Sequence, residues 1–398
     1  MTRRQFGLLA SLGAPSAAQV PSCENSHIGT LCDFVAAQAA HSTLGLSYLR
    51  DEFRDLGKWQ KLARPKLFDN LFYSPAPVAP DAKLIERRDR GDHWEEYLTF
   101  RTTADSRVPA YVLIPKNAKF PAPGVVALHD HGGFYLWGKE KILNFEDEHP
   151  TLTEFRGRYY SGKSIARDLA RLGHVVIVID MFYWGERRMI LPSDPPALRN
   201  RTPELTAKDV DQFNSRMSAQ SDLVVRSLMT AGTTWAGVML WDDIRTLDYL
   251  LTRPEVDRNR IACVGLSVGG YRSYLLGALD QRVHVVVGAG WMTSFAHQIP
   301  KHIRNTVGLT FHIPGMYKYL DLPDFAALIA PRPLLLFNGT KDALFETNGI
   351  RAAYQKIERI YAKAKAPGRQ ACRLFDVPHE FNAAMQAESW DWFGKWLK

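Results

Sequence analysis

A serine between glycines lies where an apolar strand would turn into a helix. Ser267 is the third residue of Gly-Leu-Ser-Val-Gly-Gly at 265–270, which follows the apolar run 261–264 and precedes a helical run. Glycine has no Cβ, so the chain can turn tightly without clashes two positions on either side of the serine. A strand, a tight turn and a helix are the setting of a nucleophile elbow. We predict Ser267 as a nucleophile; the plain alternative is a structural turn with an idle serine.

A serine hydroxyl needs a base to take its proton and a carboxylate to orient that base. His379 follows the last apolar run, and Asp342 follows the run 333–338. Of the twelve histidines, only His379 lies after both Ser267 and Asp342, which gives the order serine, carboxylate, histidine. Both positions are at strand carboxyl ends, where loops meet. Asp376 is an alternative acid, but a side chain within the strand would point away; a turn-forming aspartate and a loop histidine are the plain alternatives.

A pair of glycines follows the apolar run 124–128, in the sequence His-Asp-His-Gly-Gly-Phe that begins at His129. An amide N–H can approach a substrate oxygen closely there, so we predict Gly133 N–H and Val268 N–H as the oxyanion hole. His129 and His131 share one face and are candidate metal ligands. No further cluster of matching spacing completes a zinc site, so we expect them to brace the loop and expect no metal or organic cofactor.

Aromatic residues follow two of the predicted strands. Tyr183 and Trp184 come after the fourth strand and Trp291 after the sixth. At these positions they would border the crevice and could stack on a sugar or flank an acyl chain. Core packing is the alternative, since large aromatic side chains are usually buried.

The elements that must position these residues alternate between strands and helices. The first two predicted strands alternate apolar and polar residues, as an antiparallel edge pair does, and the later ones are continuous Val, Ile and Leu runs buried on both faces. Helical runs between them act as crossovers. The sequence predicts an α/β class, with a mostly parallel, eight-stranded, doubly wound sheet. The predicted strands are 94–102, 108–114, 124–130, 174–180, 261–265, 283–289, 333–338 and 372–377.

Two connections, 181–225 and 291–330, are too long for simple crossovers, and we expect them to form walls or lids over the crevice. The run 34–73 has helical spacing and predicts an N-terminal helical decoration. We predict three parts of the chain: a signal peptide at residues 1–18, the helical decoration at 19–93 and the sheet domain at 94–398.

The first residues resemble a twin-arginine export signal. Thr-Arg-Arg-Gln-Phe at 2–6 precedes a short apolar stretch, 7–14, and the small residues Ser-Ala-Ala at 16–18. These are the three parts of a signal peptide in order. We expect a periplasmic or secreted protein; the alternative is a cytoplasmic enzyme with a frayed basic N-terminus.

Composition is that of a globular protein. The 398 residues are 46% hydrophobic and 23% charged, and the net charge of +8 comes from scattered Lys and Arg, so we expect no nucleic-acid partner. No run of about 18 apolar residues predicts a membrane span. Cys23 and Cys32 lie close enough to pair after export, whereas Cys263 and Cys372 stand in strand-like runs typical of buried residues.

The ordered motifs resemble the α/β-hydrolase superfamily, and the nearest branch is the dienelactone hydrolase and acetyl xylan esterase-like group. The resemblance covers 108–398 and includes Asp-Met-Phe-Tyr-Trp-Gly-Glu-Arg at 180–187 and Leu-Ile-Ala-Pro-Arg-Pro at 328–333. It implies an α/β-hydrolase fold. Dienelactone hydrolases use a cysteine where this chain has Ser267, and glucuronoyl esterases carry an arginine where Val268 stands.

The resemblance implies a serine carboxylesterase with Ser267, Asp342 and His379 as a catalytic triad. The expected partner is a small-molecule or oligosaccharide ester, such as an acetyl ester of a carbohydrate. A serine peptidase of the prolyl-oligopeptidase type has the same residue order, but neither repeated blades nor a paired-Glu motif is evident. A binding protein that lost its chemistry is the other alternative. The sequence predicts no oligomeric state.

Overall fold

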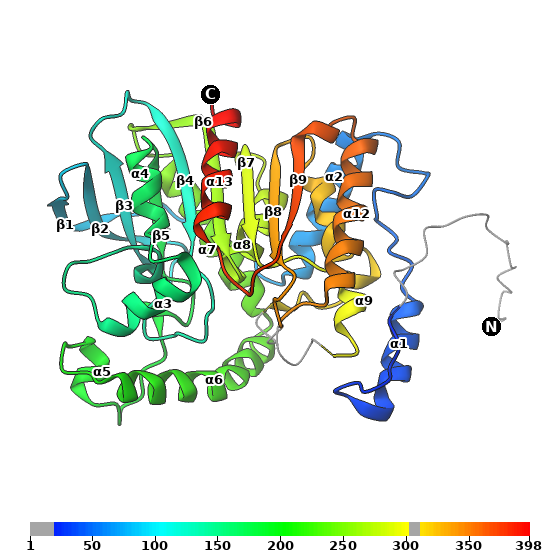
Figure 1. Cartoon of the computed structure of the whole chain (residues 1–398), viewed down its shortest axis with the longest axis horizontal. Coiled ribbons are helices and arrows are strands. Elements are labelled where there is room, and N and C mark those ends of the chain that lie inside the picture. Colours follow the sequence, from blue (N-terminus) through cyan, green and yellow to red (C-terminus); the bar gives the residue numbers. More distant parts are fainter. Residues whose placement is uncertain (1–19, 302–310) are drawn as a thin grey trace, which may run out of the picture.

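The protein is built around one twisted mixed sheet, seen in the computed structural model, which describes residues 20–301 and 311–398 (Figure 1). Within these residues nine strands form the order β1-β2-β3-β5-β4-β6-β7-β8-β9. The neighbours from β5 through β9 are parallel, and β1, β2 and β3 join them as antiparallel strands. The strands are β1 (Lys83–Asp89), β2 (His93–Arg101), β3 (Arg107–Pro115), β4 (Ala122–Leu128), β5 (Val175–Ile179), β6 (Val256–Leu266), β7 (Val285–Ala289), β8 (Leu334–Gly339) and β9 (Gln370–Phe375).

The predicted α/β class and doubly wound sheet are confirmed, but the predicted count of eight strands missed β1. All seven residues of β1 are exposed, and the strand pairs only with β2, at the edge of the sheet. Neither face of such a strand packs on the core, so its sequence, Lys-Leu-Ile-Glu-Arg-Arg-Asp, carries neither an apolar run nor an alternation. Backbone pairing with β2 and surface side-chain contacts, such as Arg87 with Glu96 and with the Trp94 ring, hold β1 in place.

Helices cover both faces of the sheet. Figure 1 shows α4 and α13 in front of the strands and α7 and α8 behind them. In α12 the buried residues Ile350, Ala353, Ile357 and Ile360 recur at helical spacing and face the core. The helices are α1 (Cys32–Ala40), α2 (Leu56–Asn70), α3 (Pro150–Tyr160), α4 (Ile165–Arg171), α5 (Pro196–Asn200), α6 (Ala207–Thr230), α7 (Trp235–Leu250), α8 (Val268–Leu279), α9 (Phe295–Gln298), α11 (Ala326–Ile329), α12 (Thr347–Lys363) and α13 (Ala383–Trp396).

The two long connections carry helices of their own. The segment 181–225 contains α5 and most of α6, a long helix that runs along the bottom of the view in Figure 1. The segment 291–330 begins with α9 and ends with α11. No single helix in the described part of the chain is long and apolar enough to cross a membrane; α6 and α7 pass that test only as a pair bent by 83°.

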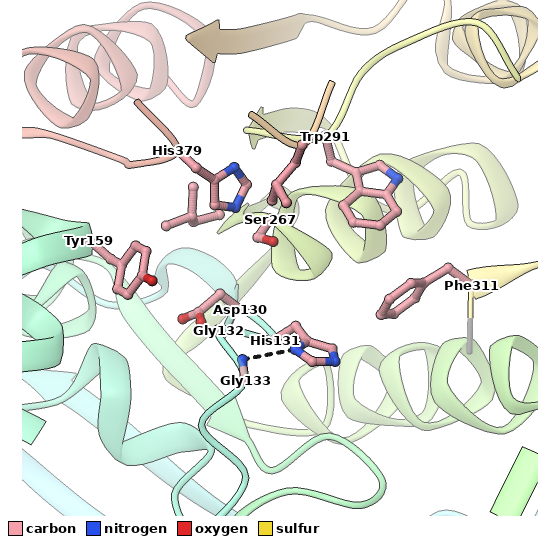
Figure 2. A pocket seen from close by; sticks show the side chains of 11 residues that line it. Asp130, His131, Gly132, Gly133, Tyr159, Ser267, Trp291, Phe311 and His379 are labelled. Atoms are coloured by element: carbon pink, nitrogen blue, oxygen red, sulfur yellow. Dashed lines mark hydrogen bonds between the residues drawn. The ribbon is translucent and has the colours of Figure 1, made fainter. Parts of the chain in front are cut away.

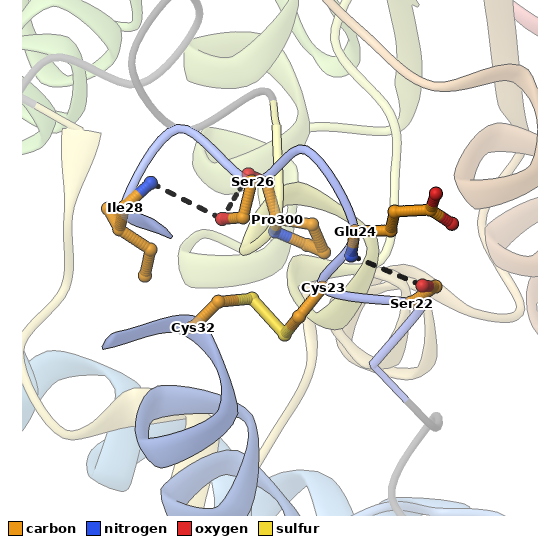
Figure 3. The surroundings of a disulfide bond; sticks show 7 residues. All are labelled: Ser22, Cys23, Glu24, Ser26, Ile28, Cys32 and Pro300. Atoms are coloured by element: carbon orange, nitrogen blue, oxygen red, sulfur yellow. Dashed lines mark hydrogen bonds between the residues drawn. A yellow bond between two sulfur atoms is a disulfide. The ribbon is translucent and has the colours of Figure 1, made fainter. Parts of the chain in front are cut away.

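The N-terminal segment is anchored to the second of these connections. Cys23 and Cys32 form a disulfide, and the loop between them reaches the end of α9 (Figure 3). There Ser26 Oγ and His27 N–H donate hydrogen bonds of 2.7 and 2.9 Å to the carbonyl of Pro300. The predicted signal peptide, residues 1–18, lies outside the described residues.

Candidate active site

Ser267 lies at a sharp turn between β6 and α8. Its φ of 56° is unusual for a non-glycine residue, and such strained backbone is typical of a nucleophile elbow. The glycines on either side are required because a side chain at either position would clash with backbone atoms. A Cβ at Gly265 would lie 2.4 Å from the carbonyl carbon of Gly269, and one at Gly269 would lie 2.0 Å from Leu128 O. The turn can therefore form only because both positions lack a side chain.

The elbow is fixed to the neighbouring strand. Ser267 N–H donates to Ala289 O at 2.7 Å, and Tyr271 N–H donates to Ser267 O at 2.9 Å as the first turn of α8. Val268 is the first residue of α8. An N–H at this position has no partner within its own helix and lies at the positive end of the helix dipole. It can therefore donate a hydrogen bond to an anionic oxygen beside Ser267.

His379 and Asp342, from loops after β9 and β8, form a hydrogen-bonded pair. His379 Nδ1 lies 2.6 Å from Asp342 Oδ2, and the aspartate side chain is fully buried. Asp342 Oδ1 accepts the N–H of Leu344 at 2.9 Å. In the neutral imidazole this contact favours the tautomer with the proton on Nδ1 and the lone pair on Nε2, which is the tautomer that a general base needs.

The loops that carry the pair run side by side. Thr340 N–H donates to Phe375 O at 2.8 Å, and Lys341 N–H donates to Val377 O at 3.1 Å. Asp376, the alternative acid, bonds Thr340 Oγ1 and Lys341 Nζ and leaves 75% of its side chain exposed. His379 bonds Asp342 instead, and Asp376 follows β9, which ends at Phe375, rather than lying within the strand as the sequence analysis expected.

Gly290, just after β7, is a site residue that the sequence analysis missed. It has a φ of 66°, and a Cβ there would lie 2.9 Å from His379 Cε1. A side chain would therefore push the imidazole away from its place next to Ser267. The only sequence signal is a glycine directly after a buried strand, which many structural turns share.

Ser267 and His379 line one pocket of about 320 Å³. In Figure 2, Ser267 lies between His379 and the loop that carries His131 and Gly133. The structure shows no hydrogen bond between Ser267 Oγ and His379; in free enzymes such bonds are commonly long and tighten when substrate binds. The remaining lining residues are Asp130, Gly132, Tyr159, Leu266, Trp291, Phe311 and Leu344.

Buried charge pins the loop that follows β4. Lys141 Nζ donates to the carbonyls of Asp130 and His131, each at 2.9 Å, and lies 3.6 Å from the Asp130 carboxylate. Tyr160 Oη donates to the same carboxylate at 2.6 Å. Burial lowers the pKa of Lys141 to about 8, so the side chain is still mostly charged at neutral pH. The hydrogen bonds from Lys141 therefore fix the backbone of this loop in place.

His131 engages one of the predicted oxyanion donors. Gly133 N–H donates to His131 Nδ1 at 2.9 Å (Figure 2), so the ring proton is on Nε2, which lies 3.3 Å from Tyr135 Oη. Burial and the charge of Lys141 lower the pKa of His131 to about 3, so the ring is neutral at pH 7. The Gly133 amide is thus paired with His131 when no substrate is bound.

His129 lies deeper, and both of its ring nitrogens have partners. Nδ1 lies 2.8 Å from Asp130 O, and Nε2 accepts the N–H of Met181 at 3.0 Å. Burial holds the pKa of His129 well below its usual range. The ring ties the loop after β4 to the loop after β5, as a brace does.

The three predicted aromatic residues occupy different places. Trp291 lines the pocket and packs against Phe311 and Phe345, with ring centroids 5.0 and 5.4 Å away. Tyr183 and Trp184 are buried, 2% and 0% exposed, and do not line this pocket. Trp184 packs behind it and donates from Nε1 to His131 O at 3.2 Å. Tyr159, Phe311 and Leu344 are lining residues that the sequence analysis did not identify.

Three carboxylates cluster at the end of β5, where Glu140, Asp180 and Glu186 offer oxygens within 4.8 Å of one another. A lysine fills the space between them. Lys139 Nζ lies 2.8 Å from Asp180, 3.2 Å from Glu140 and in direct contact with Glu186. The cluster is therefore an ion network around the buried Lys139 and Asp180, with Glu186 at its exposed side, and it fixes the turn after β5.

The chain is similar to known hydrolases. Residues 201–365 match the Abhydrolase family. YtaP of Bacillus subtilis (strain 168), named as a hydrolase, is 26% identical over 321 residues, which are 81% of this chain and 93% of YtaP. A Bacteroides fragilis NCTC 9343 protein named as an acetyl xylan esterase has a TM-score of 0.58 at 20% identity, over 80% of this chain and 75% of its own. A glucuronoyl esterase from Solibacter usitatus has a TM-score of 0.56 at 14% identity, over 85% and 93% of the two chains.

The protein has the α/β-hydrolase fold. The order of the sheet and the solved structures that the chain resembles agree on this fold, as the motifs predicted.

Proposed function

We propose that the protein is a serine carboxylesterase. Ser267 Oγ attacks the ester carbonyl carbon while His379 Nε2 takes its proton, and Asp342 stabilises the imidazolium. The tetrahedral intermediate expels the alcohol, which receives the proton from His379, and an acyl-enzyme remains on Ser267. A water molecule, deprotonated by His379, then attacks the acyl carbon and releases the acid and free Ser267.

One observation carries the proposal. A serine at a strained elbow lines the same pocket as a histidine whose Nδ1 is bound to a buried aspartate. The three side chains come from loops after β6, β8 and β9, far apart in sequence. Structural side chains have no need to meet at one solvent-accessible pocket, whereas a nucleophile, a base and its orienting acid do.

The oxyanion would be held by two backbone amides. Val268 N–H is available at the start of α8, and Gly133 N–H would exchange His131 Nδ1 for the substrate oxygen. The exchange replaces a neutral acceptor with an anionic one, which binds an N–H more strongly. Loss of one such donor typically costs about 3 to 4 kcal/mol in transition-state stabilisation.

The proposed substrate is a small acyl ester of a carbohydrate, such as an acetyl ester. Support comes from the pocket, whose lining holds aromatic and aliphatic side chains and neither lysine nor arginine, and from similarity to proteins named as carbohydrate esterases. We also propose export to the periplasm or beyond. The disulfide between Cys23 and Cys32 supports it, because such bonds persist in oxidising compartments.

Hydrolysis of p-nitrophenyl acetate, of acetylated xylo-oligosaccharides and of a peptide p-nitroanilide by purified protein tests the proposal. We expect both esters to be cleaved and the anilide to remain. Ser267→Ala should lower kcat at least about 10⁴-fold, whereas Ser193→Ala, at an exposed serine, should change it less than twofold. Faster cleavage of the anilide would favour a peptidase. Absence of any turnover would favour a binding protein and contradict the proposal.

A further inference from the structure

A second pocket, of about 350 Å³, is lined in part by the end of the loop after β4 (residues 129–141) and by the segment that follows this loop. Its walls come from β3, from residues 137–152 and from residues 200–203. None of Ser267, Asp342 and His379 lines it. Pockets of this size bind small molecules or single units of larger ones, and the proposed reaction does not use this one.

Aromatic rings form the apolar part of this second pocket. Tyr111, Trp137 and Phe145 line it. The rings of Tyr111 and Phe145 are 5.4 Å apart, and the Trp137 ring lies 5.2 Å from that of His149. These contacts fix the rings before any ligand arrives. Preset ring faces can pack against the apolar face of a sugar ring with little loss of side-chain entropy.

Polar groups at the same pocket are available to a ligand. Within the described part of the chain, no hydrogen bond occupies Tyr111 Oη, Trp137 Nε1, the Asp147 carboxylate or the Asn200 amide. Burial raises the pKa of Tyr111 to about 12, so its phenol keeps its proton and can donate. The set combines donors and acceptors, as a ligand with several hydroxyl groups requires.

The charges at the pocket are mostly paired. Glu140 bonds Arg201 at 2.8 Å, and Glu148 bonds the buried Arg156. Asp147 is left as an exposed carboxylate. Because the lining presents neither a cationic nor a strongly acidic surface, an uncharged, hydroxyl-rich ligand with a flat apolar face fits it better than an ion.

A row of aromatic rings in contact connects this pocket with the one at Ser267. Tyr159, which lines the first pocket, is followed by Phe155, Phe134 and Trp137, with successive ring centroids 4.6, 4.8 and 5.2 Å apart. Trp137 lines the second pocket. Phe134 and Phe155 are each 8% exposed. The two pockets are thus close enough for one extended molecule to occupy both.

We propose that the second pocket binds a sugar unit of the substrate, on the oligosaccharide chain that carries the ester held at Ser267. The inference rests on the proposed function for its link to catalysis. Binding of the sugar itself needs no ester, so the two can be tested separately.

Calorimetric titration of the full-length protein with unacetylated xylohexaose, cellohexaose and mannohexaose tests binding. We expect saturable binding of at least one. The double variant Asp147→Ala, Asn200→Ala, at exposed positions, should weaken it at least tenfold, and Phe145→Ala should do the same. Asp391→Ala, an exposed carboxylate on α13, is the matched control and should change the affinity less than twofold.

Kinetics complete the test. For an acetylated oligosaccharide we expect the double variant to raise KM at least fivefold, while its kcat/KM for p-nitrophenyl acetate stays within twofold of wild type. No binding of the three oligosaccharides, or binding that the double variant leaves unchanged, would overturn the inference. If wild type binds an oligosaccharide but cleaves neither ester, the proposed function fails and the sugar site stands.

Discussion

The two walls of the pocket at Ser267 are held in different ways. The β4 loop, residues 129–141, is fixed by directional bonds to buried groups, chiefly those from Lys141 to two loop carbonyls. The aromatic wall, Trp291 and Phe311, is held mainly by ring packing on Tyr271 at 5.2 and 6.0 Å. Tyr271 Oη adds a hydrogen bond of 2.9 Å to Phe311 O.

The difference separates two tasks. Amides that must meet a developing negative charge need fixed positions, since a displacement of about 1 Å can cost 100-fold in rate. An acyl group needs only a cavity of suitable shape, which packing supplies and substitution can change. We therefore expect changes in the β4 loop to alter the rate for all esters, and changes in the aromatic wall to alter the choice among them.

The largest effect is expected for Lys141→Met. The change leaves the Asp130 carboxylate buried without its cation and two loop carbonyls without a donor. The free energy of unfolding at pH 7 should fall by about 3 to 5 kcal/mol. The kcat for p-nitrophenyl acetate should fall about 100-fold, as for loss of one oxyanion donor. Urea unfolding and steady-state kinetics measure the two.

Lys163→Met is the control for this change, because Lys163 is exposed; it should alter neither quantity appreciably. An active, stable Lys141→Met enzyme would show that buried charge does not hold the β4 loop, and the contrast between the walls would be lost.

A smaller effect on the free energy of unfolding is expected when the pH is lowered. The folded-state pKa of His131, about 3, is below the usual value of 6.5, so the unfolded chain binds the extra proton between these pH values. The histidine therefore contributes stability above pH 6.5 that is lost as the pH falls toward 3. His131→Asn keeps an acceptor for Gly133 N–H but does not titrate. Between pH 7 and pH 4 the free energy of unfolding should fall by about 1 to 3 kcal/mol less in His131→Asn than in wild type. The range lies below the full value for such a pKa shift because the wild-type ring partly faces pocket water.

Unfolding free energies in urea at pH 7, 5 and 4 measure this difference. His41→Asn, at an exposed histidine, is the matched control and should follow wild type. Parallel curves for wild type and His131→Asn would mean that the ring carries no such linkage. The aromatic wall has no titrating group, so acid should weaken one wall only.

The smallest effect is expected for Trp291→Phe, which enlarges the pocket but keeps an aromatic ring against Phe345. The ratio of kcat/KM for p-nitrophenyl butyrate to that for the acetate should rise about threefold to tenfold, since a methylene in an apolar pocket contributes about 1 kcal/mol or more. The acetate rate itself should change little. Trp392→Phe on α13 is the control for loss of a tryptophan and should leave the ratio unchanged. If Trp291→Phe also leaves the ratio unchanged, the aromatic wall does not determine which ester is preferred.

The sequence could identify those site residues that stand in a recognisable local motif. Ser267 stands in a glycine motif between a strand and a helix, and Asp342 and His379 follow recognisable strands. Their order along the chain sufficed to group them, and the structure does bring the imidazole and the carboxylate within 2.6 Å. The fold followed from the same buried strands.

Features that depend on long-range contacts could not be predicted. Gly290 matters because of an imidazole nearly 90 residues later in the chain, and Tyr159 lines the pocket from a helix with no motif. Tyr183 and Trp184 are aromatic, as pocket residues often are, but they lie in the core. The sequence could not show this, because it does not indicate which face of a loop is covered by other residues. The edge strand β1 left no signal because neither of its faces is buried.

The disulfide loop at the N-terminus bears on maturation of the chain. The covalent ring begins at Cys23 and includes Ser26 and His27, the two residues that bond the carbonyl of Pro300. Proteolysis anywhere between Ala18 and Cys23 would leave that ring closed and its attachment unbroken. If the predicted signal peptide is cleaved there, the attachment at Pro300 is kept, and a trimmed and an untrimmed chain should show equal acyl preference.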